Sequence, residues 1–530
     1  MKRPLVIHPF LMALFPGLFF VTYNIGEITL SRVDAIGSLI VLPLLSLLFW
    51  LILSWIVKNR QKAGLLVSLF LFVIFSYYPV YDTLLRIFRY EVDYSKILND
   101  VVLSRILLSG SLIITAGLSW RIIKTRKSLA NVTRVINVFA AGLVGISLVQ
   151  LGGYLYQNYP ALRSDDRLEL IAEEGITRVG IENIPRGRLP DIYYIVPDRY
   201  AGEKSLKEFF GFDNFEFSGY LRKKGFYVAA DSYANYPKTS WSLAATLNYE
   251  YLDDLSGLYP KGVIDLKPLH KRIKYHKAGD FLRANGYQYI HFGSGDVERT
   301  NRSPMADRNI AYASATNLVV SLYEVSIFYH IAQLFGWEYD TRLLHRERIL
   351  FTFEKLAEMP DLDRDQPKFI FAHLLFPHPP YVFDQNGDRP GPDQSRDERE
   401  KYISQLKFSN QKFRELIDQL LTKSSVPPII ILQADEGPLP DRFQSDERNF
   451  DWRAATGAEL REKFGILNAY YLPGFDYNLL YPGITPINTF RLIFNHYFNA
   501  GYELLPDKNY TFEKILYPYE FIEVTERLNE

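Results

Sequence analysis

The sequence contains no cysteine among its 530 residues. This absence excludes a disulfide framework, a thiolate zinc site and a cysteine nucleophile, and it leaves the redox compartment open. The formal net charge is zero, because 60 lysines and arginines balance 60 aspartates and glutamates. That balance does not support a strongly basic nucleic-acid-binding domain. The apolar fraction of 48% excludes intrinsic disorder and is ample for large hydrophobic cores.

Acidic residues are scarce in the first 160 residues. This stretch has 15 lysines and arginines but only 6 aspartates and glutamates, whereas the remainder has 45 against 54. The net charge of zero is therefore the sum of a basic N-terminal part and an acidic C-terminal part. We predict two different kinds of domain in a chain whose length allows roughly three.

Five apolar stretches in the N-terminal part are close to the roughly 20 residues that a helix needs to cross a bilayer. The fourth stretch is the shortest and is diluted by serine, glycine and threonine. We predict a transmembrane domain at residues 1–156 with about five spans. These are Leu5–Tyr23, Ile36–Val57, Ala63–Val80, Ile106–Trp120 and Val135–Tyr156.

Lysine and arginine in the short loops predict the orientation of these spans. They gather at the start of the chain and in residues 58–62 and 121–134, which places these segments in the cytoplasm. Five spans then put everything after Tyr156 outside. We interpret the polar residues 157–188 as a linker and residues 189–530 as an extracytoplasmic domain. The first span lacks a small-residue cleavage site, so we expect a retained helix rather than a signal peptide.

Residues 189–530, the predicted extracytoplasmic domain, contain short apolar runs separated by segments with helical periodicity. Continuous apolar strands between helices predict an α/β domain, with a mostly parallel sheet covered by helices on both faces. Ligands of such sheets bind beyond the carboxyl ends of the strands. The expected strands are Ile192–Pro197, Tyr227–Ala230, Tyr287–Phe292, Lys368–Leu375 and Pro428–Gln433.

Carboxylates follow two of these expected strands. Asp198 follows the first strand, and the adjacent Asp435 and Glu436 follow the last. Neighbouring carboxylates repel each other unless a cation lies between them, and oxygen ligands favour Ca²⁺, Mg²⁺ or Mn²⁺. The alternatives are a solvated turn for the Asp-Glu pair and an ion pair between Asp198 and Arg199.

A hydroxyl group is expected where residues 235–243 follow a strand and begin a helical pattern. Thr239 or Ser240 then lies at a helix N-terminus, where backbone N–H groups and the helix dipole favour an anion. A threonine hydroxyl bound to a metal there is a nucleophile for phosphoryl or sulfuryl transfer. An ordinary N-cap is the alternative interpretation.

His373 and His378 are two of only nine histidines; His373 lies near the end of the expected strand Lys368–Leu375, and His378 follows that strand. Prolines at 377, 379 and 380 restrict the backbone around His378. This setting suits a fixed donor toward a phosphate oxygen or a leaving group. A histidine of the core or of a turn is the alternative, and His291 and His345 show no comparable setting.

In this order, the residues resemble the sulfatase-like branch of the alkaline phosphatase superfamily. Together with the five spans, the architecture resembles lipoteichoic acid synthase and related phosphoglycerol transferases. The resemblance covers about residues 189–507. It rests on residues 190–198, on Lys238-Thr239-Ser240, on residues 373–381 and on residues 431–438.

The resemblance implies one divalent metal ion (Mn, Mg or Ca) and a covalent ester between Thr239 and the transferred group. The metal ligands that it implies are Asp198, Thr239, Asp435 and Glu436. The substrate-binding residues that it implies are Lys238, Ser240, His373 and His378.

The chain departs from this family at two points. The usual Asp-His-Gly is Asp435-Glu436-Gly437 here, so the site keeps a metal with altered preference or is weakened. The sulfatase signature of Cys or Ser followed by x-Pro-x-Arg is absent around Thr239. Because the chain has no cysteine to become formylglycine, an arylsulfatase is not expected.

We therefore expect a metal-dependent enzyme that transfers or hydrolyses a phosphoester headgroup, of phosphoglycerol or phosphoethanolamine type, at the outer membrane surface. Its partners would be the lipid bilayer and a phospholipid or cell-surface glycan, without nucleic acid. Two alternatives stay open: a hydrolase of phosphate or sulfate esters on cell-surface polymers, and a non-catalytic envelope-assembly protein with a decayed site. The spans contain almost no ionisable residues, which argues against a transporter.

Overall fold

A computed structural model describes most of the chain, in two compact units. The units are Met1–Leu168 with Ala313–Asp340, and Glu169–Tyr312 with Thr341–Glu530. The described residues are 4–24, 32–86, 100–163, 189–256, 266–296, 299–312, 322–323, 325–335, 341–363, 366–391, 397–444, 450–514 and 517–529. Most of the expected linker, residues 164–188, lies outside them, so the domain boundaries stay predictions.

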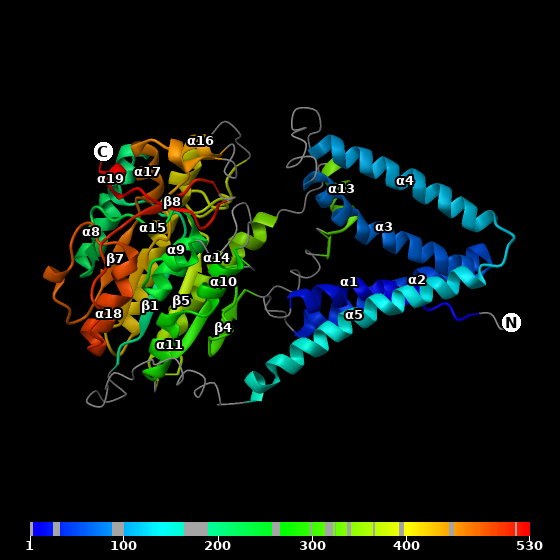
Figure 1. The fold of residues 1–530 in the computed structure, drawn as a ribbon, viewed down its shortest axis with the longest axis horizontal. Helices are drawn as coiled ribbons and strands as arrows, with labels where there is room; N and C mark the ends of the chain where they lie inside the picture. Colours follow the sequence, from blue (N-terminus) through cyan, green and yellow to red (C-terminus); the bar gives the residue numbers. More distant parts are fainter. Residues whose placement is uncertain are drawn as a thin grey trace. The chain divides into compact units, whose positions relative to one another are not determined.

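The first unit consists mainly of apolar helices (Figure 1). Four segments are long and apolar enough to cross a membrane: Leu39–Val57, Arg60–Leu84, Val102–Lys124 and Ala130–Gly153. A fifth apolar helix, at His8–Phe20, is shorter. The prediction of about five apolar N-terminal helices is confirmed. Their bounds are α1 His8–Asn24, α2 Arg32–Val57, α3 Arg60–Arg86, α4 Asp100–Lys124 and α5 Ala130–Arg163.

The sequence suggested that the fourth helix is the shortest, but the shortest of the five is the first. Helix α4 has 25 residues and α1 has 17. The polar residues of α4 do not shorten it, because a helix can satisfy a hydroxyl internally. Thr115, for example, donates a hydrogen bond of 2.6 Å to the Ser111 carbonyl one turn earlier.

Helix α1 packs against α2, α3 and α5 (Figure 1). The contact with α3 is close, since a Cβ atom added at Gly64 would lie 3.3 Å from the ring of His8 in α1. Beside it, the buried His8 shares a hydrogen bond of 2.6 Å with the Ser68 hydroxyl. Small and hydroxyl-bearing residues therefore make this helix interface, as is usual in membranes.

The second unit is an α/β domain around a seven-stranded sheet with the strand order β2-β7-β6-β1-β5-β3-β4. Strands β6, β1, β5, β3 and β4 are parallel, and β7 runs antiparallel to both β6 and β2. The predicted mostly parallel sheet is confirmed, and β4 and β7 are additional strands. The bounds are β1 Ile192–Pro197, β2 Tyr227–Val228, β3 Gln288–Gly293, β4 Arg308–Ala311, β5 Lys368–Leu374, β6 Ile429–Gln433 and β7 Asn468–Tyr471, with a separate pair β8 Tyr510–Phe512 and β9 Phe521–Glu523.

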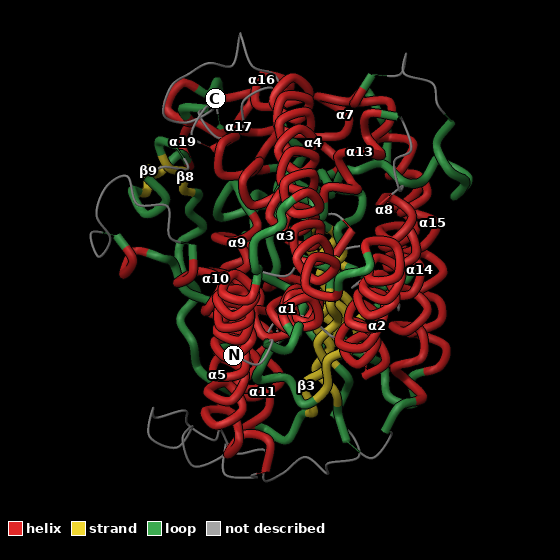
Figure 2. Tube along the Cα trace, turned by 90° about the vertical axis from the view of Figure 1, so that its right-hand side faces the viewer, coloured by secondary structure: helices red, strands yellow, loops and turns green. Residues whose placement is uncertain are grey.

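Helices cover both faces of this sheet, with α9, α10 and α11 on one side and α14 and α15 on the other (Figure 2). On the first side Phe490 of α18 packs edge-on against Tyr194 of β1, and on the second Phe353 of α14 packs against Phe413 of α15. The bounds are α7 Glu203–Phe210, α8 Phe215–Lys223, α9 Thr239–Asn248, α10 Lys267–Lys274, α11 Lys277–Ala284, α14 Thr341–Glu358, α15 Glu398–Lys423, α16 Asp441–Gln444, α17 Gly457–Phe464, α18 Thr489–Phe498 and α19 Thr525–Leu528.

The register of the central strands positions the site. Strand β1 lies between β5 and β6, and Val196 of β1 pairs with His373 of β5. Just beyond the strand, the Asp198 N–H donates a 2.9 Å hydrogen bond to the Leu374 carbonyl. Because the three strands are parallel, their carboxyl ends meet at one edge of the sheet.

Candidate active site

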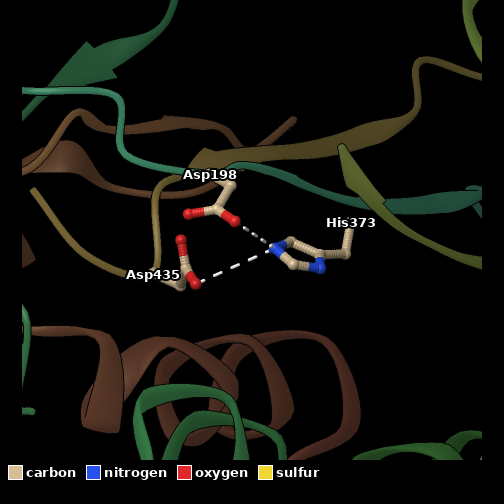
Figure 3. Close-up of side chains that lie close together, drawn as sticks. All are labelled: Asp198, His373 and Asp435. Carbon is tan, nitrogen blue, oxygen red and sulfur yellow. Dashed lines mark ion pairs between the residues drawn. The ribbon is translucent and has the colours of Figure 1, made fainter. Parts of the chain in front are cut away.

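Asp198, His373 and Asp435 come together at this edge, one after each of β1 and β6 and one within the end of β5 (Figure 3). The Nε2 atom of His373 lies 3.5 Å from Asp198 Oδ2 and 3.8 Å from Asp435 Oδ2. All three side chains are buried, and their potential ligand atoms lie within 4.8 Å of one another. The structure therefore joins residues from three separate parts of the sequence into one cluster.

Several polar atoms of this cluster have no hydrogen-bond partner among the described residues. They are Asp198 Oδ1, His373 Nε2 and both carboxylate oxygens of Asp435. Leaving a buried polar atom unpaired costs on the order of 1–3 kcal/mol, and more for a charged group. A divalent cation accepts such oxygen and nitrogen donors, so the residues present fit a metal ion.

The ionisation of the cluster reflects the crowding of two carboxylates. Burial and the charge of Asp198 raise the pKa of Asp435 to about 7. Burial also acts to raise the pKa of Asp198, but the charge of His378 and the contact with His373 outweigh it and lower the pKa. For His373, burial acts to lower the pKa, and the two carboxylates reverse this and raise it. The cluster thus has excess negative charge that a cation would neutralise.

Glu436 lies beside this cluster in a buried ion-pair network. Its Oε1 is 2.9 Å from Arg199 Nε, and its Oε2 is 3.1 Å from Lys463 Nζ. Burial acts to raise the pKa of Glu436, but Lys463 and Arg199 outweigh it and lower the pKa. Arg199 therefore forms an ion pair with Glu436, whereas an ion pair with Asp198 was the alternative considered from the sequence. The role of Glu436 as a metal ligand stays a prediction.

Lys463 is fully buried, and it holds the backbone as well as the carboxylate. Its Nζ donates a hydrogen bond of 2.8 Å to the Gly437 carbonyl. A side chain at Gly437 would put its Cβ atom 2.5 Å from the Glu462 carbonyl oxygen and 2.8 Å from that of Lys463. The glycine after Glu436 is thus required for the close approach of this segment. Burial lowers the pKa of Lys463 to about 8, although Glu436 opposes the shift.

Thr239 is the first residue of α9 and is buried. It follows Lys238, whose backbone is extended, with φ −145° and ψ 145°. Thr239 acts to lower the pKa of Asp435, so it lies near the cluster, and its role as nucleophile stays a prediction. The Ser240 hydroxyl has a different partner, because it lies 3.3 Å from His270 Nε2. The half-buried Lys238 acts electrostatically on both Glu436 and Lys463.

His378 lies in the loop after β5 and is half-buried. The charges of Asp198 and Glu436 act on it, although burial dominates and lowers its pKa. Gln405 of α15 fixes the loop backbone, because its Nε2 donates to the carbonyls of Pro377 and His378 at 3.1 and 3.2 Å. Both histidines that the sequence singled out therefore lie at the site, but His373 is the one within the cluster.

Thr300 is a site residue that the sequence did not indicate. Its Oγ1 lies 2.8 Å from His373 Nδ1 and 2.8 Å from Ser294 Oγ. When Nδ1–H donates to Thr300, the Nε2 lone pair of His373 faces the two carboxylates. Hydrogen bonding to the second ring nitrogen is how proteins fix the tautomer of a metal-binding histidine.

A buried chain of hydrogen bonds supports Thr300 from behind. The Gly279 N–H donates to His276 Nδ1 at 2.9 Å, so the proton of this neutral ring is on Nε2. His276 Nε2 then donates to the Tyr289 hydroxyl at 3.0 Å, and Tyr289 donates to His291 Nδ1 at 3.0 Å. His291 Nε2 completes the chain by donating to the Thr300 carbonyl at 2.9 Å.

Arg299 is a second site residue that the sequence analysis missed. It pairs with Asp296, and the charges of Asp198 and Glu436 act on it as well. Burial acts to lower the pKa of Arg299, but these carboxylates raise it. The signal in the sequence was the polar run that follows the expected strand Tyr287–Phe292. Polar residues therefore follow a fourth expected strand, in addition to the three strands whose ends provided the candidate residues.

The profile of the sulfatase family matches residues 210–490, which is more than half of the chain. The chain belongs to the sulfatase family. The matched region includes Thr239, His373 and Asp435, and it begins after Asp198. The expected resemblance is thereby confirmed, and membership of the sulfatase family implies a hydrolase or a transferase. No protein of curated function matched this sulfatase-family chain.

Solved structures that resemble this sulfatase-family chain include three bacterial domains at low identity. The C-terminal periplasmic domain of EptC from Escherichia coli has 11% identity and a TM-score of 0.42, over 63% of this chain and 92% of that chain. That of the phosphoethanolamine transferase EptC from Campylobacter jejuni has 14% identity and a TM-score of 0.36, over 59% and 90%. The lipoteichoic acid synthase LtaP from Listeria monocytogenes has 13% identity and a TM-score of 0.38, over 66% and 84%.

Proposed function

We propose that this sulfatase-family protein transfers or hydrolyses a phosphoester headgroup, of phosphoglycerol or phosphoethanolamine type, at the outer surface of the membrane. One observation carries the proposal. Thr239, the first residue of α9, acts on the pKa of Asp435, which belongs to a buried cluster of two carboxylates and one imidazole. This arrangement supports Thr239 as the nucleophile, the cluster as the metal site and the N-terminus of α9 as the end that binds the anion.

Asp198, His373 and Asp435 would hold one divalent ion, with the Thr239 hydroxyl beside them. The carboxylates alone suit Mg²⁺, Ca²⁺ or Mn²⁺, whereas the imidazole nitrogen shifts the preference toward Mn²⁺ or Zn²⁺. When bound, such an ion lowers the pKa of a coordinated hydroxyl and polarises a phosphoryl oxygen. Glu436 would act indirectly, because its two oxygens face Arg199 and Lys463.

Covalent transfer would proceed in two balanced steps. The Thr239 oxygen forms a bond to phosphorus, its proton passes to the carboxylate side of the cluster, and the bond between phosphorus and the lipid alcohol breaks. Binding of the anionic phosphoester would favour the protonated form of His378, which then gives its proton to the departing alcohol; the charge of Asp198 acts on this histidine in the same direction. A second alcohol or a water molecule then attacks phosphorus and gives its proton to His378. The bond between Thr239 and phosphorus breaks, the headgroup leaves on the acceptor, and the Thr239 oxygen takes its proton back from the carboxylates.

The membrane helices favour a lipid-linked substrate, because a soluble phosphate ester does not require an enzyme with several spans. The proposed orientation has the N-terminus in the cytoplasm and the catalytic domain outside, as the positive loops indicate. A phospholipid would supply the headgroup, and a lipid or cell-surface glycan would receive it. With water as the acceptor, the same site acts as a hydrolase.

Mass spectrometry of the full chain tests this proposal. The purified protein in nanodiscs is incubated with phosphatidylethanolamine and phosphatidylglycerol in the presence of Mn²⁺ or Zn²⁺, and Thr239 is searched for an adduct. We expect an adduct of headgroup size that is absent in Thr239→Ala and retained in Ser240→Ala, since Ser240 faces His270. No adduct and no bound metal would contradict the proposal and favour a non-catalytic protein.

A further inference from the structure

One helix from the outer part of the sequence belongs to the membrane unit. Helix α13 (Ile327–Leu334) lies in the segment Ala313–Asp340, which groups with the first unit. It packs against α3 and α4 (Figure 1). Ile327 of α13 joins Tyr77 and Leu108 in a small buried apolar cluster. The chain thus leaves the α/β domain after β4, contacts the membrane helices and returns at α14.

His330 makes this contact specific. Its ring is buried, with its centroid 4.8 Å from that of Tyr77 and 4.5 Å from that of Tyr81. Its Nδ1 lies 3.4 Å from the Ser104 hydroxyl, and the Tyr77 hydroxyl donates to the Ser104 carbonyl at 3.0 Å. Tilted contacts between rings and hydrogen bonds together hold α13 against the ends of α3 and α4.

An exposed aromatic surface lies beside the packed face of α13. Phe328 is in the helix, and Phe335 directly follows it in a turn. They are 53% and 63% exposed. The eight residues of α13 include no charged side chain. Soluble surfaces rarely show such a face unless something covers it.

The neighbouring surface indicates what covers this face. The segments of α3 and α4 next to α13 expose apolar side chains as well, including Val80, Val102 and Ile106. These residues belong to, or border, the segments that are apolar enough to cross a membrane. The exposed surface that Phe328 and Phe335 form is therefore continuous with a surface that faces lipid. Aromatic side chains are enriched where a membrane meets water.

We propose that α13 is an interfacial membrane helix, with Phe328 and Phe335 inserted into the outer leaflet of the bilayer. The partner of this surface is lipid, and the helix is a second membrane anchor for a chain that the spans already hold. A helix with one packed face and one aromatic face lies in the plane of the interface. This inference does not depend on the catalytic activity.

The anchor has a direct connection to the catalytic domain. Helix α14 is the next element after α13 in the chain, and its His345 lies 3.1 Å from the Leu375 carbonyl oxygen in a hydrogen bond through Nε2. Leu375 directly follows β5, the strand that carries His373. The bilayer contact and the support of the active-site loop are therefore on consecutive elements.

The absence of cysteine allows a clean test. Single cysteines are introduced as Phe328→Cys and Phe335→Cys in the full chain, labelled with the fluorophore NBD and reconstituted in phosphatidylglycerol/phosphatidylethanolamine nanodiscs. The matched control is Phe215→Cys on α8, because Phe215 is also 63% exposed but belongs to the α/β unit. Monodisperse gel filtration and an unchanged circular dichroism spectrum identify the variants that fold.

We expect blue-shifted emission at positions 328 and 335, quenching by a nitroxide-labelled phospholipid, and iodide quenching several-fold weaker than at 215. Iodide quenching equal to that at position 215 would overturn the proposal. So would fluorescence insensitive to the nitroxide lipid but changed by protein concentration, since that would indicate a contact between copies. If one labelled variant does not fold, the other gives the same distinction, because positions 328 and 335 are labelled and measured independently.

Discussion

Thr300 connects two parts of the site at the level of single atoms. Its hydroxyl lies 2.8 Å from His373 Nδ1, and its carbonyl accepts a hydrogen bond of 2.9 Å from His291. The first contact orients the imidazole, and the second fixes the backbone that carries the hydroxyl. Thr300 is therefore a positioning residue, because it acts through His373.

Replacing Thr300 by valine tests this role. Thr300→Val keeps the shape of the side chain but leaves the buried His373 Nδ1–H without a partner, so we expect metal affinity to fall about 10- to 100-fold. Thr300→Ser retains the hydroxyl and should bind nearly as tightly as the unmodified protein. Titration calorimetry with Mn²⁺ or Zn²⁺ measures both. Equal affinities of the valine and serine variants would refute the positioning role.

Glu436 shows how an unusual residue is accommodated by its neighbours. It lies between Arg199 and Lys463, and both carboxylate oxygens have a cation within 3.1 Å. A buried carboxylate beside Asp435 would be strongly unfavourable without these partners. The buried Lys463 therefore compensates the buried negative charge of Glu436.

A double-mutant cycle measures this dependence. Lys463→Met and Glu436→Gln each remove one buried partner, and we expect each to lower the free energy of unfolding by about 3–5 kcal/mol. The double variant should lose less than the sum by more than about 1 kcal/mol, because neither charge is left alone. Urea unfolding in detergent gives these values. As a control, the exposed pair of Lys204 and Asp231 should show a coupling of at most about 1 kcal/mol.

Helix α11 begins with an unusual N-cap. His276 accepts a hydrogen bond at Nδ1 from the Gly279 N–H, and it can do so only while the ring is neutral. Burial and the charge of His291 lower the pKa of His276 to about 3. The N-cap of α11 and the hydrogen-bond chain to Thr300 therefore both require a neutral His276 ring.

The cap predicts that acid weakens the fold. The unfolded chain binds a proton at His276 near pH 6.5, but the folded chain does so only near pH 3. This contribution to stability is complete above pH 6.5 and is lost by about 1.4 kcal/mol per pH unit as the pH falls toward 3. Urea midpoints between pH 7.5 and 5 measure it. His276→Asn keeps an N-cap acceptor without titrating and should show a shallower slope; an unchanged slope would exclude His276 as the cause.

At the scale of the whole molecule, the acidic cluster lowers the stability of the protein when no metal ion is bound. Asp198 and Asp435 repel each other, and their unpaired oxygens are a cost of folding in the absence of a cation. A metal that binds only the folded protein offsets this cost. The stabilisation is about 2.7 kcal/mol at a metal concentration 100 times the Kd.

Thermal unfolding of the full chain tests this balance. Mn²⁺ or Zn²⁺ should raise the Tm of the unmodified protein. Asp435→Asn should have a higher Tm than the unmodified protein without metal, because it removes a repelling charge, and it should not respond to metal. Asp418→Asn, at an exposed carboxylate of α15, should keep the metal response. A metal-induced rise in Asp435→Asn would place the ion elsewhere.

The agreement between the predicted and observed site differs from residue to residue. Strand β1 has the predicted bounds, and Asp198 lies directly after it, since a short apolar run between polar segments is a local signal. The predicted role of His373 in substrate binding stays a prediction, and the structure adds that its Nε2 lies 3.5 Å from Asp198 and 3.8 Å from Asp435. Lys463 and Thr300 had no signal of their own, because their importance comes from residues far away in the chain.

The sequence alone determined the apolar helices, most strand positions and the residues at the strand ends, because hydrophobic periodicity and charge act between near neighbours in the chain. Only the tertiary structure decided that β1 lies between β5 and β6, that Glu436 pairs with Arg199 and Lys463, and that α13 returns to the membrane helices. These outcomes depend on which buried surfaces and charges satisfy one another across long loops. That choice is made by the packing of the whole chain and is not encoded in any one segment.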